Sequence, residues 1–295
     1  MSSSAGFVAL AGRPNVGKST LVNAIVGAKI AIVSDKPQTT RRAIRGIAMR
    51  GDAQLVLVDL PGVQRPRDPL TQRMQQRVER EFEDADAAVL LLNGEQGIGP
   101  GDRFIAAALA HADIPVAIVV NKVDRLDRAR TVAVLQAAAD LGISDEIFPV
   151  SARKGTGVEA LVEHLVDLLP ESPHLFAVDD ASDQPEAVLV AELIREQILR
   201  RTFQEVPHAV EVVVEEIDDA REDGLVRVQA LAWVEAESQK GILIGAQGRM
   251  IKAIGTAARR ELERHLGTRV HLDLSVRVRR GWRADDALLD RLGIE

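Results

Sequence analysis

The stretch GRPNVGKST, from Gly12 to Thr20, directly follows the apolar run FVALA at residues 7–11. It matches the pattern G-x-x-x-x-G-K-[ST], in which a glycine-rich loop joins a strand to a helix. The glycines let successive backbone N–H groups turn toward one point, and the N-terminus of the following helix adds to the attraction for phosphate oxygens. The stretch therefore predicts a phosphate-binding loop near the start of an α/β domain.

The residues of this loop have separate expected roles. Lys18 reaches the β- and γ-phosphates and is a candidate catalytic residue, while Ser19 offers its hydroxyl to Mg²⁺. Asn15 is also a candidate ligand for a monovalent cation such as K⁺, against the simpler interpretation of an asparagine that forms a turn. The residues expected to contact the nucleotide are Gly12, Asn15, Val16, Gly17, Lys18, Ser19 and Thr20.

Around this loop, residues 6–169 alternate short apolar runs with helical patterns. The runs are apolar on both faces, as buried parallel strands are. They are FVALAG, AQLVLVDL, DAAVLLLN, PVAIVVNK and EIFPVSA, and the helical patterns cover 18–26, 70–82, 102–112, 128–141 and 158–168. This alternation predicts an α/β P-loop domain over residues 1–170 with a doubly wound, mostly parallel sheet. Its ligand is expected at the C-terminal ends of the strands.

The motif NKVD, residues 121–124, indicates which base is bound. Guanine presents its N1–H and N2–H₂ donors side by side, so the carboxylate of Asp124 can accept both, whereas adenine has an acceptor at N1. Asn121 ties the loop together and reaches the base edge, and the aliphatic stem of Lys122 lies over the ring. The stretch SAR after the next strand adds Ser151 and directs the Ala152 N–H toward guanine O6. Together these residues predict a guanine nucleotide, GTP or GDP.

Two further stretches predict the magnesium site and the nucleotide switches. DLPG, residues 59–62, follows a buried strand, so Asp59 is expected to hold Mg²⁺ through water and the Gly62 N–H to sense the γ-phosphate. KPQTTRR, residues 36–42, lies between the first helix and that strand. One of its threonines completes the Mg²⁺ shell when GTP is bound. We expect Thr40 in this role, with Thr39 as the alternative.

The predicted chemistry is Mg²⁺-assisted attack of water on the γ-phosphate, with Lys18, Thr40 and Gly62 as the catalytic candidates. In many such enzymes a glutamine directly after the glycine orients the water. Val63 stands at that position, and Gln64 is a weak substitute. We therefore expect slow intrinsic hydrolysis that is raised by a partner, by bound water alone or by a cation.

Beyond residue 170 the pattern changes. Residues 171–185 contain prolines and acidic residues without periodicity, which is typical of a linker. Residues 186–295 are predicted to form a second, α+β domain in the order α-β-β-α-α-β with a short C-terminal tail helix. Its elements are a helix at 186–203, the strands AVEVVVEEID and LVRVQALAWVE, helices at 240–254 and 256–266 that meet at Gly255, and the alternating strand RVHLDLSVRVR.

The second unit contains GAQG, Gly245 to Gly248, between two helical segments. A GXXG loop in this order of elements is typical of a type II KH domain, where it lets the backbone of single-stranded RNA approach closely. Since aromatic residues are scarce, bases are expected to meet apolar walls and hydrogen bonds rather than stacking platforms. The expected RNA-contacting residues are Lys240, Ile244, Gly245, Gly248, Arg249, Ile251, Lys252 and Arg259.

The net charge of −7 alone argues against a nucleic-acid partner, but the distribution of charge does not. Residues 203–238 contain two basic and ten acidic residues, a net of −8, and residues 239–283 contain eleven basic and three acidic, a net of +8. Such segregation creates a basic face on an acidic chain. The 295 residues contain no cysteine, which excludes disulfides and thiolate metal sites, and no apolar run is long enough to span a membrane.

Taken together, the motifs GRPNVGKS, QTTR, DLPG, NKVD and SAR, followed by GILIGAQGRMIKAIGTAARREL, VHLDLSVRV and GWRADDALLDRLG, resemble the bacterial Era family of GTPases. This resemblance covers nearly the whole chain. It implies a cytoplasmic GTPase with peripheral contact at the inner face of the cell membrane. Its expected partners are the 3′ end of small-subunit (16S) ribosomal RNA and the 30S subunit, not DNA. An apolar residue at Val63 fits that family.

Two alternatives remain at this point. One is an RNA-binding chaperone module whose nucleotide domain is mainly structural, although every residue type of the nucleotide site is present. The other is a GTPase that acts on a small molecule or modifies tRNA, although no second catalytic constellation is visible and the six histidines lack metal-ligand spacing.

Overall fold

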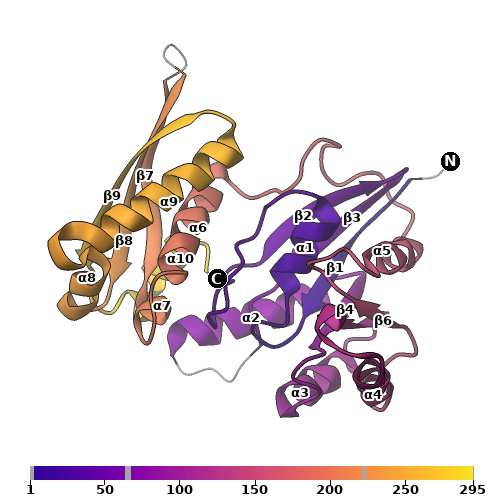
Figure 1. Ribbon diagram of the computed structural model, residues 1–295. Coiled ribbons are helices and arrows are strands. Elements are labelled where there is room, and N and C mark those ends of the chain that lie inside the picture. The colour runs from indigo at the N-terminus through magenta and orange to yellow at the C-terminus, as the bar shows by residue number, and fades with distance from the viewer. Residues whose placement is uncertain (1–2, 64–67, 221–223, 295) are drawn as a thin grey trace.

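The computed structural model describes residues 3–63, 68–220 and 224–294, which form two units side by side (Figure 1). The first unit is a six-stranded sheet in the order β2-β3-β1-β4-β5-β6. Its strands are β1 (Ser4–Ala11), β2 (Ile44–Arg50), β3 (Ala53–Asp59), β4 (Ala87–Asn93), β5 (Val116–Asn121) and β6 (Ile147–Val150). The doubly wound, mostly parallel sheet is confirmed.

The strand β2 is a correction, because the sequence pattern predicted no strand there. It pairs antiparallel with β3 at the edge of the sheet, whereas β1, β3, β4, β5 and β6 run parallel. Its sequence, IRGIAMR, carries arginines and a glycine and is only partly buried. A strand whose apolar residues are interrupted by arginines and a glycine lacks the continuous apolar run by which the other strands are recognised.

Helices cover both faces of this sheet. They are α1 (Lys18–Val26), α2 (Pro69–Glu83), α3 (Pro100–Leu109), α4 (Arg128–Ala139) and α5 (Val158–Asp167), close to the predicted ranges. Leu21 of α1 and Leu161 of α5 belong to one core, and Val78 of α2 and Ile105 of α3 belong to another. The chain thus changes face between its first two crossovers, and the phosphate loop lies at the C-terminal end of the central strand β1, where such sheets bind ligands.

The segment expected to be a linker lies along the outer strands of this sheet. The amides of Leu175 and Phe176 donate to the side-chain oxygen of Gln54 on β3, at 2.7 and 3.0 Å. The Ile47 amide on β2 donates to the Ala181 carbonyl at 2.9 Å. This segment is therefore tied to the first unit over part of its length.

The second unit is built on the sheet β7-β8-β9. The strands β7 (Glu211–Ala220) and β8 (Leu225–Val234) are antiparallel, and β8 is parallel to β9 (Arg269–Val278). Its helices are α6 (Glu186–Leu199), α7 (Val206–Ala209), α8 (Glu237–Ile244), α9 (Arg249–Leu266) and α10 (Asp286–Arg291). Leu193 of α6 and Leu262 of α9 are fully buried in the core formed with the sheet.

One predicted boundary in this unit is wrong. Helix α9 runs unbroken through Gly255, and the two helices meet instead at the loop from Gly245 to Gly248. The backbone bends there because Gly245, Gln247 and Gly248 all have positive φ, at 69°, 54° and 75°. A single glycine costs a helix only about 1 kcal/mol, so it does not end one by itself.

The two units share a small apolar core. Leu70 and Met74 of α2 pack with Trp233 of β8 and with Trp282 and Leu289 near the C-terminus. Figure 1 shows α10 and the C-terminal end close to α2. The second unit also contacts the segment between α1 and β2, through Lys29, Ile32 and Arg41, so it is packed against both this segment and α2.

Candidate functional site

The phosphate loop surrounds the end of Lys18. The Lys18 ammonium donates to the carbonyls of Gly12 and Arg13 at 3.0 and 3.2 Å, and burial lowers its pKa to about 8. At Gly17 (φ 108°) a Cβ would lie 2.3 Å from the Asn121 side chain, so only glycine fits. The loop places a buried cation where phosphate oxygens are expected.

Three side chains meet beside this loop. The Ser19 hydroxyl donates to Asp59 Oδ2 at 2.6 Å, and Thr40 Oγ1 lies 3.3 Å from the same oxygen and 3.1 Å from Ser19 Oγ. The Thr39 hydroxyl instead donates to the Lys36 carbonyl at 2.6 Å. The structure thus brings Thr40, and not Thr39, to Ser19 and Asp59.

This group of oxygens fits a magnesium ion. Carboxylate and hydroxyl oxygens are the hard ligands that Mg²⁺ prefers. Asp59 Oδ1 is buried without a hydrogen-bond partner among the described residues, and burial raises the pKa of this carboxyl. A buried, unpartnered carboxylate oxygen is costly, and a cation or its water shell would satisfy it.

The residues after Asp59 lie directly against the phosphate loop. A Cβ on Gly62 would lie 2.8 Å from backbone atoms of Pro14, so this position also requires glycine. The Val63 amide donates to the Gly12 carbonyl at 3.3 Å, and its side chain is buried in the apolar core of this face. Val63 offers no polar group to a water, and Gln64 lies outside the described residues.

The predicted base-recognition residues also converge. The Asn121 amide donates to the Val16 carbonyl at 2.9 Å, and its oxygen accepts from the amides of Lys122 and Ala152 at 2.8 and 3.0 Å. The Ala152 N–H is therefore directed at Asn121 here, where a guanine O6 would be a second acceptor. Asp124 Oδ1 accepts from the Ser151 hydroxyl at 2.7 Å, which holds the pKa of Asp124 below its ordinary value.

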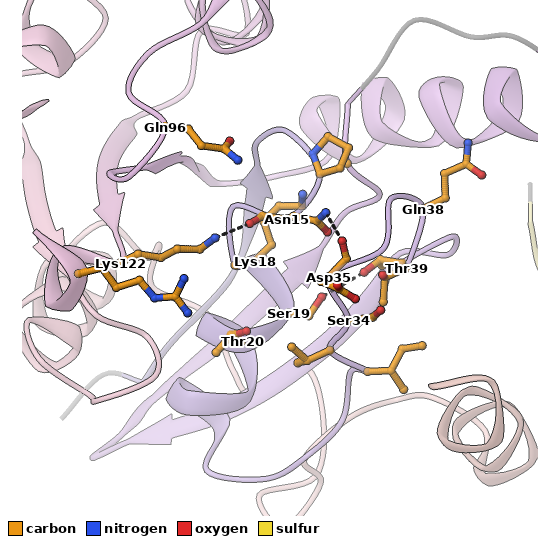
Figure 2. Close-up of a pocket in the computed structure, with 17 residues that line it drawn as sticks. Asn15, Lys18, Ser19, Thr20, Ser34, Asp35, Gln38, Thr39, Gln96 and Lys122 are labelled. Carbon is orange, nitrogen blue, oxygen red and sulfur yellow. Dashed lines mark hydrogen bonds between the residues drawn. The ribbon is translucent and has the colours of Figure 1, made fainter. Parts of the chain in front are cut away.

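A cavity of about 450 Å³ joins the phosphate and magnesium regions to Lys122 (Figure 2). Sequence reasoning missed part of its lining. Ser34 and Asp35 come from the loop after α1, and the Asn15 amide donates to the Asp35 carbonyl at 2.7 Å. Gln96 and Arg125 follow the C-terminal ends of β4 and β5. Because ligands bind at these ends, their position in the sequence could have predicted that they line the cavity. Thr20 lies on the first turn of α1 and also lines the cavity.

The predicted RNA-contacting residues lie on α8, on the bend that follows it and along α9. Gly245 and Gly248 form the bend between α8 and α9, and Ile244 and Ile251 on either side are partly buried against the core. Arg249, Lys252 and Arg259 are exposed along α9, and Lys240 is half-buried on α8. Within the described parts of the chain, no group of three or more His, Cys, Asp and Glu residues suits a metal, and no helix is long and apolar enough to cross a membrane.

Comparison with known proteins identifies the family. The model of a 50S ribosome-binding GTPase family matches residues 7–122, and that of the KH domain matches residues 205–283. A GTPase Era of Caldanaerobacter subterraneus subsp. tengcongensis is 45% identical over 289 residues, which cover 98% of this chain and 97% of that protein. This chain belongs to the GTPase Era family. The Era of Mycobacterium avium is likewise 45% identical over 293 residues, with 98% of each chain covered.

Two solved Era structures match over the whole length. A crystal structure of Era in complex with MgGDPNP and nucleotides 1506–1542 of 16S ribosomal RNA aligns with a TM-score of 0.95, at 33% identity and over 99% of both chains. An Aquifex aeolicus Era variant bound to GDP·AlF₄⁻ aligns with a TM-score of 0.93, also at 33% identity and over 99% of both chains. The arrangement of a P-loop GTPase domain and a KH domain is thus shared with both of these Era structures.

Proposed function

We propose that this chain binds and hydrolyses GTP and uses its nucleotide state to control binding of the 3′ end of 16S ribosomal RNA during assembly of the 30S subunit. The observation that carries the proposal is the full-length structural agreement with the Era bound to MgGDPNP and 16S RNA. In this assignment residues 1–170 bind the nucleotide, 171–185 connect the domains and 186–295 bind RNA.

The residues of the site would share the chemistry as follows. Lys18 and the Gly62 N–H hold the γ-phosphate, while Asp124 and Asn121 hold the base. Mg²⁺, held by Ser19, Thr40 and water on Asp59, supplies neutralisation of phosphate charge. Val63 provides no hydrogen bond to the attacking water, so we expect slow hydrolysis in the absence of a partner or cation.

Potassium is the cation we propose beside the phosphates. The Asn15 amide donates to the Asp35 carbonyl, and both residues line the cavity, so two oxygen-bearing groups lie together beside the phosphate loop. Exchange of K⁺ for Na⁺ should lower turnover in the wild type and change it less in Asn15→Ala.

We also propose a cytoplasmic location with peripheral membrane contact. This proposal rests on family resemblance and is tested by cell fractionation.

Binding of labelled single-stranded RNA tests the central proposal. The probe matches the 3′ end of 16S RNA, with a scrambled control, and is titrated with GDP and with a non-hydrolysable GTP analogue at a fixed salt concentration, because phosphate contacts depend on salt. We expect tighter binding of the matched RNA with the GTP analogue. Equal, sequence-independent binding in both states would contradict the proposal. A wild type without GTP turnover would favour the chaperone alternative.

A further inference from the structure

The segment that carries Thr40 lies between the magnesium region and the second domain. The Thr40 hydroxyl faces Ser19 and Asp59, as described above. The residues on either side of it, Thr39 and Arg41, both contact the second domain through buried arginine side chains. Thr40 therefore lies between two residues that contact a domain beginning about 145 residues later in the chain.

On one side, Arg195 of α6 holds the backbone. Its guanidinium is fully buried and donates to the Thr39 carbonyl, while Nε and a terminal nitrogen donate to Glu192 at 3.0 and 2.6 Å. Glu192 also accepts from Arg42 at 2.9 Å. The second domain thus donates a charge-assisted hydrogen bond to the peptide unit that joins Thr39 to Thr40.

On the other side, Arg41 is held in the second domain. Its fully buried guanidinium donates to Glu211 at 2.6 Å and to the carbonyls of Val210 and His208 at 2.7 and 3.1 Å. A buried charge without its partner is strongly destabilising. The Arg41 guanidinium therefore stays with Glu211 for as long as the two domains remain packed together.

We propose that Arg195, together with the buried Arg41–Glu211 pair, positions Thr40 for magnesium, so that the RNA-binding domain supplies part of the support for the nucleotide site. The inference rests on the proposed role of Thr40 as a magnesium ligand. Groups that orient metal ligands affect metal affinity about 10- to 100-fold when removed. Separation of the domains would withdraw this support and weaken Mg²⁺-dependent binding of GTP, but not binding of GDP through the base and the phosphate loop.

The test compares Arg195→Met with Arg73→Met. Arg73 pairs with Asp286 and Asp290 of α10, so its variant removes another interdomain contact without touching Thr39 or Arg41. Affinities for a GTP analogue and for GDP are measured over a range of Mg²⁺ concentrations. We expect Arg195→Met to raise the Mg²⁺ concentration for half-maximal analogue binding about tenfold, with GDP binding unchanged. Arg73→Met should resemble the wild type. Arg195→Lys keeps the positive charge, so its Mg²⁺ requirement should lie between those of the wild type and Arg195→Met.

Hydrogen exchange supplies a readout that is independent of the nucleotide. The amides of residues 39–42 should exchange faster in Arg195→Met than in the wild type or Arg73→Met. Unchanged GDP affinity shows that the first domain of Arg195→Met is folded, and an unchanged circular dichroism spectrum shows the same for the second domain, which carries Arg195. Arg41→Met should act in the same direction from the other side of Thr40.

Thr40→Ala separates the two proposals. If Thr40→Ala weakens Mg²⁺-dependent analogue binding and Arg195→Met does not, the positioning role is overturned while the proposed function stands. If Thr40→Ala itself has no effect, the magnesium role of Thr40 fails, and the inference fails with it.

Discussion

At the scale of single residues, Asp124 determines the choice of base in the proposed site. Asp124→Asn replaces one acceptor oxygen by an amide donor, which suits the C2 carbonyl of xanthine and not the C2 amino group of guanine. We expect GDP affinity to fall about 100-fold or more, because two charge-assisted hydrogen bonds are lost, and xanthosine diphosphate affinity to rise. Competition binding with both nucleotides measures this, and retained guanine selectivity would contradict the role of Asp124.

Ser151 determines the pH range over which Asp124 can recognise the base. Its hydroxyl, at 2.7 Å from Asp124 Oδ1, is the main cause of the lowered pKa of Asp124. Guanine binding requires the carboxylate, so it is present above this pKa and is lost as the pH falls through it. Ser151→Ala should raise the pKa of Asp124, so GDP affinity should begin to fall at a higher pH than in the wild type.

The measurement is GDP affinity between about pH 3 and pH 6, a range that includes the ordinary aspartate pKa of about 3.9. Ser144→Ala is the matched control, since Ser144 lies in the loop before β6, away from Asp124, and its hydroxyl accepts from the Glu146 amide. Identical pH curves for Ser151→Ala and the wild type would show that Ser151 does not tune Asp124.

At the scale of elements, the bend between α8 and α9 offers two glycines with different surroundings. A Cβ on Gly245 would lie 2.7 Å from Met250 Cβ, whereas nothing lies within 4 Å of one on Gly248. Gly248→Asp therefore adds negative charge to the loop at the cost of a positive φ alone, about 1–2 kcal/mol. We expect RNA affinity to fall about tenfold or more, because the carboxylate faces phosphates, with GDP affinity unchanged.

Gly267→Asp is the control for this prediction. Gly267 ends α9 at its far end, with a φ of 67° and nothing within 4 Å of an added Cβ. It therefore matches Gly248 in strain and in added charge. Equal RNA affinity of the two variants, measured by titration with the labelled probe, would remove the GXXG loop from the proposed RNA interface.

At the scale of the whole molecule, Trp282 links the domains. It is fully buried in the shared core, its indole donates to the Ala209 carbonyl at 3.0 Å, and Arg41 lies over its ring. Trp282→Ala should cost about 3–5 kcal/mol, since a large buried side chain is lost. Because that loss falls at the contact between the domains, we expect calorimetry to show two separate unfolding transitions instead of a shared one.

Leu262→Ala tests whether this effect belongs to the interface. Leu262 is equally buried but lies in the core beneath the sheet of the second domain, to which the first domain contributes Ile32. It should lower the stability of that domain without separating the transitions. Added GDP should raise only the transition of the first domain in Trp282→Ala, because a ligand stabilises the unit that binds it. A single transition that GDP shifts as a whole would contradict the prediction.

Much of this protein could be predicted from short stretches of sequence. The phosphate loop, NKVD and the bounds of α1 follow from residues that are neighbours in the chain, where backbone freedom and side-chain chemistry act locally. The mostly parallel sheet followed from apolar runs of strand length. Strand β2 did not, because its apolar residues are interrupted by arginines and a glycine. The helix junction was misplaced at Gly255, because the sequence does not show that the backbone bends at the GXXG loop instead.

The sequence by itself therefore determined the class of fold, the motifs of the proposed guanine site and the GXXG loop of the proposed RNA interface. Only the tertiary structure decided that Thr40 rather than Thr39 faces Asp59, and that Arg195 reaches across to the peptide between them. The two threonines are neighbours with the same side chain, so only the path of the backbone decides which of them faces Asp59. For Arg195 the physical reason is distance along the chain. A buried ion pair or hydrogen bond between residues more than 150 positions apart depends on how two domains pack, and no local pattern of residue types encodes that packing.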